Sequence, residues 1–262
     1  MTDRPGSLEA HLLARRDAGA KLLVPYVTGG LGPDWIDVLA AMVDAGADAV
    51  EIGIPFSDPV MDGPTIQEAS ERALRRGTTP TGIFAELRAA EIGVPLVAMT
   101  YYNLVFRAGH RRFAAELAGA GVGGIVLPDV PMEEQGAWAP AAAQEGIETV
   151  LLAGPITPDD RLALVCERSR GFVYGVNVMG VTGERGALGA AAATLARRLK
   201  AATDRPVLMG FGVSGPEQAV SLAAEADGVV AASAIMRRLL DGGGPADAGA
   251  FVATLRRALD AG

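Results

Sequence analysis

Short apolar runs recur along the whole chain, and each is separated from the next by a longer stretch of mixed polar and apolar residues. A glycine or proline turn precedes each run after the first, and a helical pattern follows each one. Continuous apolar strands that alternate with helices are typical of a parallel sheet covered on both faces. The pattern predicts eight strands, at residues 22–28, 49–52, 95–101, 124–127, 149–152, 172–176, 207–210 and 229–232.

Eight strand–helix units without a composition break favour one α/β domain over residues 1–262, a closed (β/α)8 TIM barrel. A doubly wound open sheet is the alternative, but no Gly-x-Gly-x-x-Gly motif follows the first strand. Leu8, Leu12 and Leu13 have the spacing of an amphipathic helix over residues 7–18, which could cover one end of the barrel. A last amphipathic helix is predicted over residues 246–259.

The stretch of residues 49–67 starts as a strand and becomes a loop in which three prolines fix the backbone φ angle. Glu51 lies inside the apolar run, where a carboxylate without a partner would be costly. It could face solvent at the strand end or pair with an arginine. The functional interpretation is that Glu51 and Asp62 meet at one mouth of the barrel, as a pair for acid and base chemistry.

Other candidate residues lie at the same ends of the predicted strands, where the active sites of such barrels are built. Two turns of small residues, 210–214 and 231–234, follow the seventh and eighth strands, the usual phosphate site of this fold. Residues 177–186 form a glycine-rich loop long enough to act as a lid. A set of apolar and aromatic residues could line a slot for a flat ring or be ordinary core: Tyr26, Met99, Tyr101, Leu127, Leu152, Tyr174 and Phe211.

Composition narrows the classes of partner. The formal net charge is −8 and no Lys/Arg run exceeds two residues, which argues against nucleic acid and anionic membranes as partners. One cysteine and two histidines leave little for a transition-metal site, and no metal is expected. The N-terminus lacks a basic and then apolar signal and no apolar run reaches the length of a membrane span, so a cytoplasmic protein is expected.

The run Glu51-Ile-Gly-Ile-Pro-Phe-Ser-Asp-Pro-Val-Met-Asp-Gly-Pro64 resembles the signature of the tryptophan synthase α subunit family. Further blocks resemble that family in family order: Pro25-Tyr-Val-Thr28, Met99-Thr-Tyr-Tyr-Asn103, Pro128-Asp-Val-Pro131, Gly180-Val-Thr-Gly183 and Gly210-Phe-Gly-Val-Ser214. The resemblance covers nearly the whole chain. It implies a lyase of tryptophan biosynthesis that cleaves indole-3-glycerol phosphate to indole and glyceraldehyde 3-phosphate by a retro-aldol reaction, without a metal or an organic cofactor.

The resemblance also assigns roles. Glu51 matches the family's proton-transferring acid, Asp62 the carboxylate that binds the ring N–H, and Tyr174 a tyrosine near the reacting centre. Thr182 matches the lid threonine that closes toward Asp62. The implied partner is a pyridoxal-phosphate-dependent β subunit, in an α2β2 heterotetramer. Phosphate-binding positions are matched by Gly183, Gly212 and Ser233, beside Ala232.

Three departures from the family pattern bear on these roles. Ala232 replaces the glycine usual before the phosphate-loop serine, Val178 occupies a lid position that is often arginine, and Met61 replaces a frequent alanine. They leave open a stand-alone indole-glycerol-phosphate lyase of a specialised pathway. Another phosphosugar isomerase or lyase on the same barrel, or a catalytically idle barrel that activates a β subunit, are the further alternatives.

Overall fold

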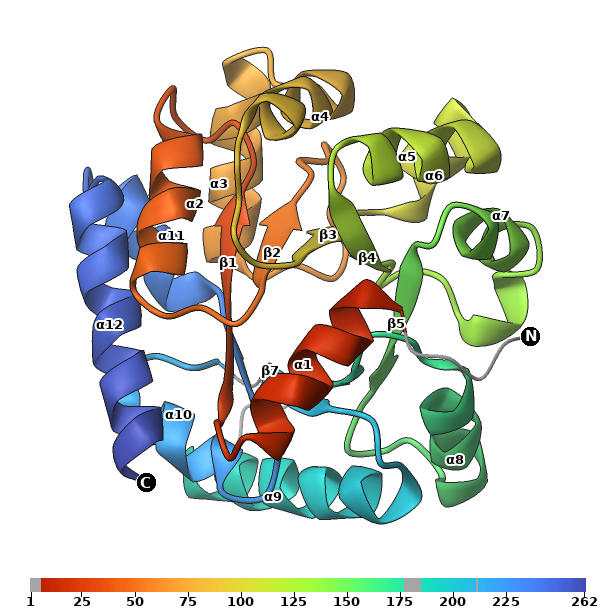
Figure 1. Ribbon diagram of the computed structural model, residues 1–262, viewed down its shortest axis with the longest axis vertical. Coiled ribbons are helices and arrows are strands. Elements are labelled where there is room, and N and C mark those ends of the chain that lie inside the picture. The colour runs from red at the N-terminus through yellow and green to blue at the C-terminus, as the bar shows by residue number, and fades with distance from the viewer. Residues whose placement is uncertain (1–5, 177–184, 211) are drawn as a thin grey trace.

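The computed structural model describes residues 6–176, 185–210 and 212–262, and its strands form one closed parallel barrel inside a ring of helices (Figure 1). The strands follow one another around the barrel in chain order, and β1 pairs with β8 to close it. The predicted (β/α)8 class is therefore confirmed, and the open doubly wound sheet is wrong. The strands are β1 Leu22–Thr28, β2 Val50–Gly53, β3 Leu96–Met99, β4 Val122–Val126, β5 Glu148–Ala153, β6 Val173–Val176, β7 Val207–Gly210 and β8 Gly228–Ala231.

Helices cover the outside of the barrel, and one further helix, α1, lies across the centre of the strand ring (Figure 1). The N-terminal and C-terminal helices are within a few residues of the predicted ranges. Their bounds are α1 Ser7–Asp17, α2 Trp35–Asp44, α3 Pro64–Arg75, α4 Pro80–Ala89, α5 Tyr102–Ala108, α6 His110–Gly119, the 3-10 helix η1 Met132–Glu134, α7 Trp138–Gln144, α8 Asp159–Arg168, α9 Arg185–Ala202, α10 Pro216–Ala223, α11 Ser233–Leu240 and α12 Pro245–Ala261.

Alternate residues of each strand point into the barrel and out toward the helices, because side chains alternate along a strand. On β1, Leu22 and Val24 belong to the cluster that fills the barrel, whereas Leu23 and Val27 belong to the larger cluster under the helices. Leu8 and Leu12 of α1 join the inner cluster and close the barrel at the N-terminal ends of the strands. The opposite end of the barrel, at the C-terminal ends of the strands, stays open and can hold the candidate functional site.

Buried carboxylates hold the closed end together. Glu148 accepts hydrogen bonds from the N–H groups of Leu8 and Glu9, at 2.7 and 3.1 Å, and so caps the first turn of α1. Asp48 accepts the N–H of Leu23 at 2.8 Å and pairs with Arg256 at 3.2 Å. Neither carboxylate was predicted from the sequence.

The third strand is shorter than predicted. It ends at Met99 rather than at residue 101, because Tyr101 is the residue before α5 and its chain has left the sheet. The Asp129 carboxylate accepts the N–H of Tyr102 at 3.0 Å, which satisfies a free donor of the first helical turn. The fourth strand starts two residues earlier than predicted, at Val122.

Of the helices that the structure describes, none has the length and apolar character needed to cross a membrane.

Candidate functional site

Glu51 is the central residue at the open end of the barrel. It lies two residues after the inward-facing Ala49 on β2 and pairs in register with Tyr26 of β1 and Val97 of β3. Its side chain is 1% exposed, and Oε1 has no hydrogen-bond partner among the described residues. Glu51 therefore does not face solvent, and it does not pair with any arginine whose side chain the structure describes. Burial, with a further contribution from the nearby charge of Asp62, raises the pKa of Glu51 to about 8.

Asp62 lies in the loop between β2 and α3 and is only partly buried. Burial raises the pKa of Asp62, and a hydrogen bond from Tyr101 opposes that rise. Tyr101 also accepts the N–H of Met61 at 2.9 Å, and its ring stacks on Phe56 with a centroid distance of 5.1 Å. The loop is thus fixed by a buried phenol as well as by its prolines, and Asp62 is held within electrostatic reach of Glu51.

Tyr26 and Tyr174 face Glu51 from two other strands. Both side chains are buried, and both phenols have a raised pKa, chiefly because of burial and in part because of the Glu51 charge. Two glycines make room for them: a Cβ on Gly53 would collide with the Tyr26 hydroxyl, and one on Gly210 would collide with the Tyr174 ring. Small residues at the strand ends therefore let two tyrosines reach the mouth of the barrel.

The remaining predicted slot residues differ in where they lie. Met99 and Leu152 are partly buried and pack against the inner cluster of the barrel. Leu127 is buried and belongs to the outer cluster, although it also lines a hollow of about 430 Å³ that Met61 and Leu152 border. Phe211, Thr182, Gly183 and Val178 lie outside the residues that the structure describes, as does most of the predicted lid, 177–184.

The candidate phosphate position comprises the loop after β7 and the start of α11. Gly212 is exposed with φ of +70°, a left-handed conformation that favours glycine. Ser233 is exposed at the first position of α11, and Ala232 before it has φ of −116°, which any residue can adopt. The first turn of a helix offers free N–H groups to an anion.

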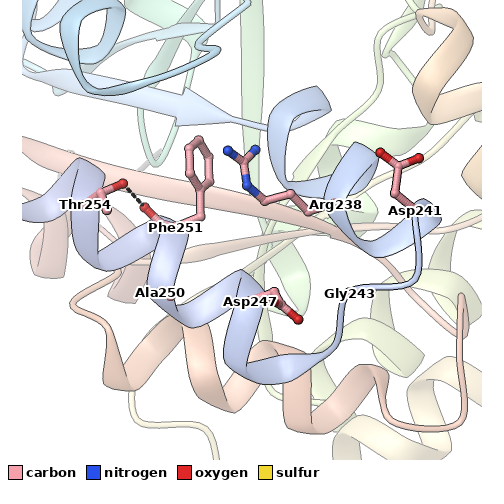
Figure 2. Close-up of a pocket in the computed structure, with 7 residues that line it drawn as sticks. All are labelled: Arg238, Asp241, Gly243, Asp247, Ala250, Phe251 and Thr254. Atoms are coloured by element: carbon pink, nitrogen blue, oxygen red, sulfur yellow. Dashed lines mark hydrogen bonds between the residues drawn. The ribbon is translucent and has the colours of Figure 1, made fainter.

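A separate hollow of about 470 Å³ lies between α11 and α12 and contains none of the predicted site residues. Figure 2 shows the Arg238 guanidinium beside the Phe251 ring, and its central carbon is 3.7 Å from the ring centroid. Of the residues that line this hollow, Arg238, Asp241, Asp247 and Ala250 are exposed, whereas Phe251 is buried. The described residues contain no group of three or more His, Cys, Asp or Glu side chains placed to hold a metal ion.

Two contacts of the site were not predicted from the sequence. Thr28 donates its hydroxyl to the Tyr26 oxygen at 3.3 Å, and Tyr101 holds Met61 as described above. The first has a sequence signal, because residues 26 and 28 share one face of a strand. The second has none, since residues 61 and 101 meet only in the folded barrel.

Comparison with known proteins gives one consistent result. The family described as tryptophan synthase alpha chain matches residues 13–252. The alpha chain of Streptomyces coelicolor is 45% identical over 234 residues, which cover 88% of this chain and 83% of the relative. That of Rhizorhabdus wittichii is 46% identical over 256 residues, 93% of either chain.

Solved structures agree with these relatives. A chain of tryptophan synthase from Mycobacterium tuberculosis superposes with a TM-score of 0.89 at 37% identity and covers 98% of this chain and 99% of its own. The alpha subunit of tryptophan synthase from Legionella pneumophila gives a TM-score of 0.88 at 28% identity, with 98% and 100% covered. The similarity therefore extends over the whole barrel rather than over one loop.

Proposed function

Because this chain belongs to the tryptophan synthase alpha chain family, a family of lyases in tryptophan biosynthesis, we propose that its barrel cleaves indole-3-glycerol phosphate to indole and glyceraldehyde 3-phosphate. One observation carries the proposal at the level of residues. Glu51 is a buried carboxyl group whose Oε1 has no partner in the described part of the chain, and Asp62 lies close enough to influence its ionisation. Paired carboxyl groups whose surroundings differ are typical of acid–base catalysis.

Glu51 is the proposed proton carrier. A pKa of about 8 keeps it protonated near neutral pH, so that it can give its proton to the indole carbon that leaves. The bond between that carbon and the glycerol carbon then breaks, and the glycerol hydroxyl loses its proton as the aldehyde C=O forms. The Glu51 carboxylate, now ionised, takes up that proton. Atoms and charge balance over the cycle, and the reaction requires no metal and no organic cofactor.

Asp62 is the proposed partner of the indole ring nitrogen. Protonation of the ring carbon places positive charge on that nitrogen, and a carboxylate that accepts the ring N–H stabilises the charge. The hydrogen bond from Tyr101 opposes the effect of burial on the pKa of Asp62, which favours the ionised form. Tyr101 also accepts a hydrogen bond from the N–H of the neighbouring Met61. Its contacts with Met61 and Asp62 support a fixed position for the Asp62 carboxylate.

The proposed binding residues surround these two groups. A slot for the flat ring is supported by Tyr26 and Tyr174, which lie against Gly53 and Gly210 at the strand ends, and by Met99 and Leu152, which pack against the inner cluster. Tyr101 and Leu127 are proposed to lie at its edge. Gly212, Ala232 and Ser233 are proposed to hold the phosphate through backbone N–H groups. Phe211, Thr182 and Gly183 complete the proposal, although they are outside the described part of the chain.

We expect Ala232→Gly to change the KM for indole-3-glycerol phosphate only slightly. Alanine keeps the backbone N–H, and its φ of −116° carries no strain that glycine would relieve. The measurement is KM for the two proteins under one set of conditions. A gain in affinity of more than about tenfold, roughly 1.4 kcal/mol, would show that the methyl group obstructs the phosphate.

The family name implies a β subunit as partner. We propose that the partner is a pyridoxal-phosphate-dependent β subunit in an α2β2 assembly, and that docking raises the rate of cleavage. A partner that binds the closed form of the site more tightly shifts the population toward it. Slow release of indole by the chain alone and faster release with saturating β subunit are the expected results.

The purified full-length chain tests this with indole-3-glycerol phosphate, with and without a cognate β subunit, by measuring indole. Equal rates in both arms would favour the stand-alone lyase that Val178 makes conceivable. Absence of indole in a single turnover, with and without β subunit, would contradict the proposed activity and favour an idle barrel that only activates its partner.

A further inference from the structure

The Tyr26 hydroxyl lies at the mouth of the barrel, above Glu51. Tyr26 and Glu51 pair in register on β1 and β2, and both follow inward-facing residues by two positions. The ring extends toward the strand ends, because its hydroxyl touches the space that a Cβ of Gly53 would fill. Gly53 is the next inward position after Glu51 on β2. The phenol oxygen is thus fixed one level closer to the mouth than the Glu51 backbone.

The hydrogen-bonding capacity of this phenol is only half used. Its oxygen accepts the Thr28 hydroxyl at 3.3 Å, while its own proton has no acceptor among the described residues. Glu51 Oε1 is buried, and no described residue donates a hydrogen bond to it. An unused donor and an unused acceptor therefore face the same small space from adjacent strands. No hydrogen bond joins them in the structure, but Glu51 has three rotatable side-chain bonds, whereas the Tyr26 ring is confined against Gly53.

Among the side chains that the structure describes, no cation is found next to Glu51 that could stabilise its carboxylate. The titratable groups that face Glu51 or its neighbours are Tyr26 on β1, Asp62 after β2, Tyr101 after β3 and Tyr174 on β6. Three of these are phenols and the fourth is a carboxyl group, whose charge disfavours ionised Glu51. Burial keeps the pKa of the Tyr26 phenol above its ordinary value, so it remains a donor. Ionised Glu51 must then be stabilised by neutral donors.

We propose that Tyr26 is a positioning residue whose hydroxyl, backed by Thr28, donates a hydrogen bond to the ionised Glu51 carboxylate. The catalytic part of this inference rests on the proposed function, in which Glu51 is first an acid and then a base. A neutral carboxylic acid does not need the bond, and the carboxylate left after proton transfer does. Tyr26 thus stabilises the second state and holds Glu51 for the return of the proton.

The test compares Tyr26→Phe with the unchanged protein, because phenylalanine keeps the ring and removes only the hydroxyl. The first readout is a titration of the Glu51 carboxyl carbon by ¹³C NMR, with its signal assigned from the loss in Glu51→Gln. Loss of one charge-assisted hydrogen bond should raise the pKa of Glu51 by about one pH unit. The second readout is indole release, where kcat should fall about tenfold with little change in KM.

Two further variants separate positioning from packing. Thr28→Val removes the hydroxyl behind Tyr26 and should raise the pKa of Glu51 by less than Tyr26→Phe does, without touching the ring. Tyr102→Phe is the matched control, because its hydroxyl contacts His110 on the outer rim at 2.7 Å, and it should leave the titration unchanged.

An unchanged or lowered pKa of Glu51 in folded Tyr26→Phe would overturn the inference, as would an equal rise in Tyr102→Phe. If Tyr26→Phe did not fold, an unchanged titration in Thr28→Val would overturn it in the same way. The NMR readout does not need turnover. If the unchanged protein released no indole but the pKa of Glu51 rose in Tyr26→Phe as expected, the result would contradict the proposed function. It would still support the hydrogen bond from Tyr26 to Glu51.

Discussion

Glu51→Gln is expected to lower the kcat for indole release by roughly 10²- to 10⁴-fold, the usual contribution of a general acid–base group. Glutamine has the size of glutamate but can neither give a proton to the ring carbon nor take one from the glycerol hydroxyl. The barrel should remain folded, because Oε1 has no hydrogen bond to the residues that the structure describes, and so none of these that the amide would break. Indole release measures the first effect, and thermal unfolding measures the second.

Asp62→Asn is the matched comparison for this variant. Its amide oxygen can still accept the ring N–H but no longer offers a negative charge, so the loss should be smaller than for Glu51→Gln. Near-normal turnover in Glu51→Gln would refute the assigned proton carrier. A larger loss at Asp62 than at Glu51 would reverse the ranking of the two carboxyl groups.

The raised pKa of Glu51 gives this result a pH dependence with a definite sign. The acid form is present below about pH 8, so the protonation step should weaken as pH rises through that value. The same group affects stability. Its pKa is above the unfolded value, so its stabilising contribution is complete below about 4.5 and is lost as pH rises through about 8. Glu51→Gln has no such loss, so its stability relative to the unchanged protein should increase over this range.

Asp48→Ala is expected to lower the free energy of unfolding by about 3 to 5 kcal/mol, the usual cost of breaking a buried ion pair from one side. The side chain of Asp48 is 1% exposed, and it accepts the Leu23 N–H and pairs with Arg256, whose side chain is 10% exposed. Alanine would leave that guanidinium and that N–H without this acceptor. Urea unfolding measures the change, and the melting temperature should fall by about 10 °C.

Arg15→Ala provides the control for this prediction. Arg15 also pairs with Asp48, at 2.7 Å, but its side chain is 47% exposed, so its removal should cost less than about 1 kcal/mol. Equal losses in the two variants would show that the burial of Arg256 is not the reason for the effect. Since Asp48 lies at the closed end of the barrel, folded Asp48→Ala should keep the KM for substrate.

The fold was predictable because each strand is a compact apolar run between a helix end and a turn. The bounds of β1 and β7 agree with the prediction residue for residue. The third strand was predicted too long, since its apolar and aromatic run continues to Tyr101. Helix α5 starts there instead, and the Asp129 carboxylate caps it at Tyr102 from 27 residues further along the chain. Periodicity within a window does not contain a contact of that range.

In the candidate site, too, local features were predictable from the sequence and long-range contacts were not. The signature loop and its two carboxyl groups could be read directly, and so could the inward tyrosines at strand ends. The lack of a hydrogen-bond donor for Glu51 Oε1 among the described residues could not be predicted from the sequence. It depends on which side chains the other strands bring close to Glu51 in the folded barrel. The carboxylates of the closed end were missed for a similar reason. Glu148 meets Leu8 across 140 positions, and a single acidic residue in a strand carries no local sign of such a partner.

The capping of α1 by Glu148 has a consequence for the synthesis of the protein on the ribosome. The helix is made before the carboxylate that caps it, which follows 140 residues later. At about 5 to 20 residues per second, that interval is about 7 to 28 s. During this time Leu8 and Leu12 have no barrel to enter, and a helix this short is marginal in water on its own. This helix must therefore wait for a much later segment before it docks, and its apolar face is a surface that chaperones can bind in the nascent chain.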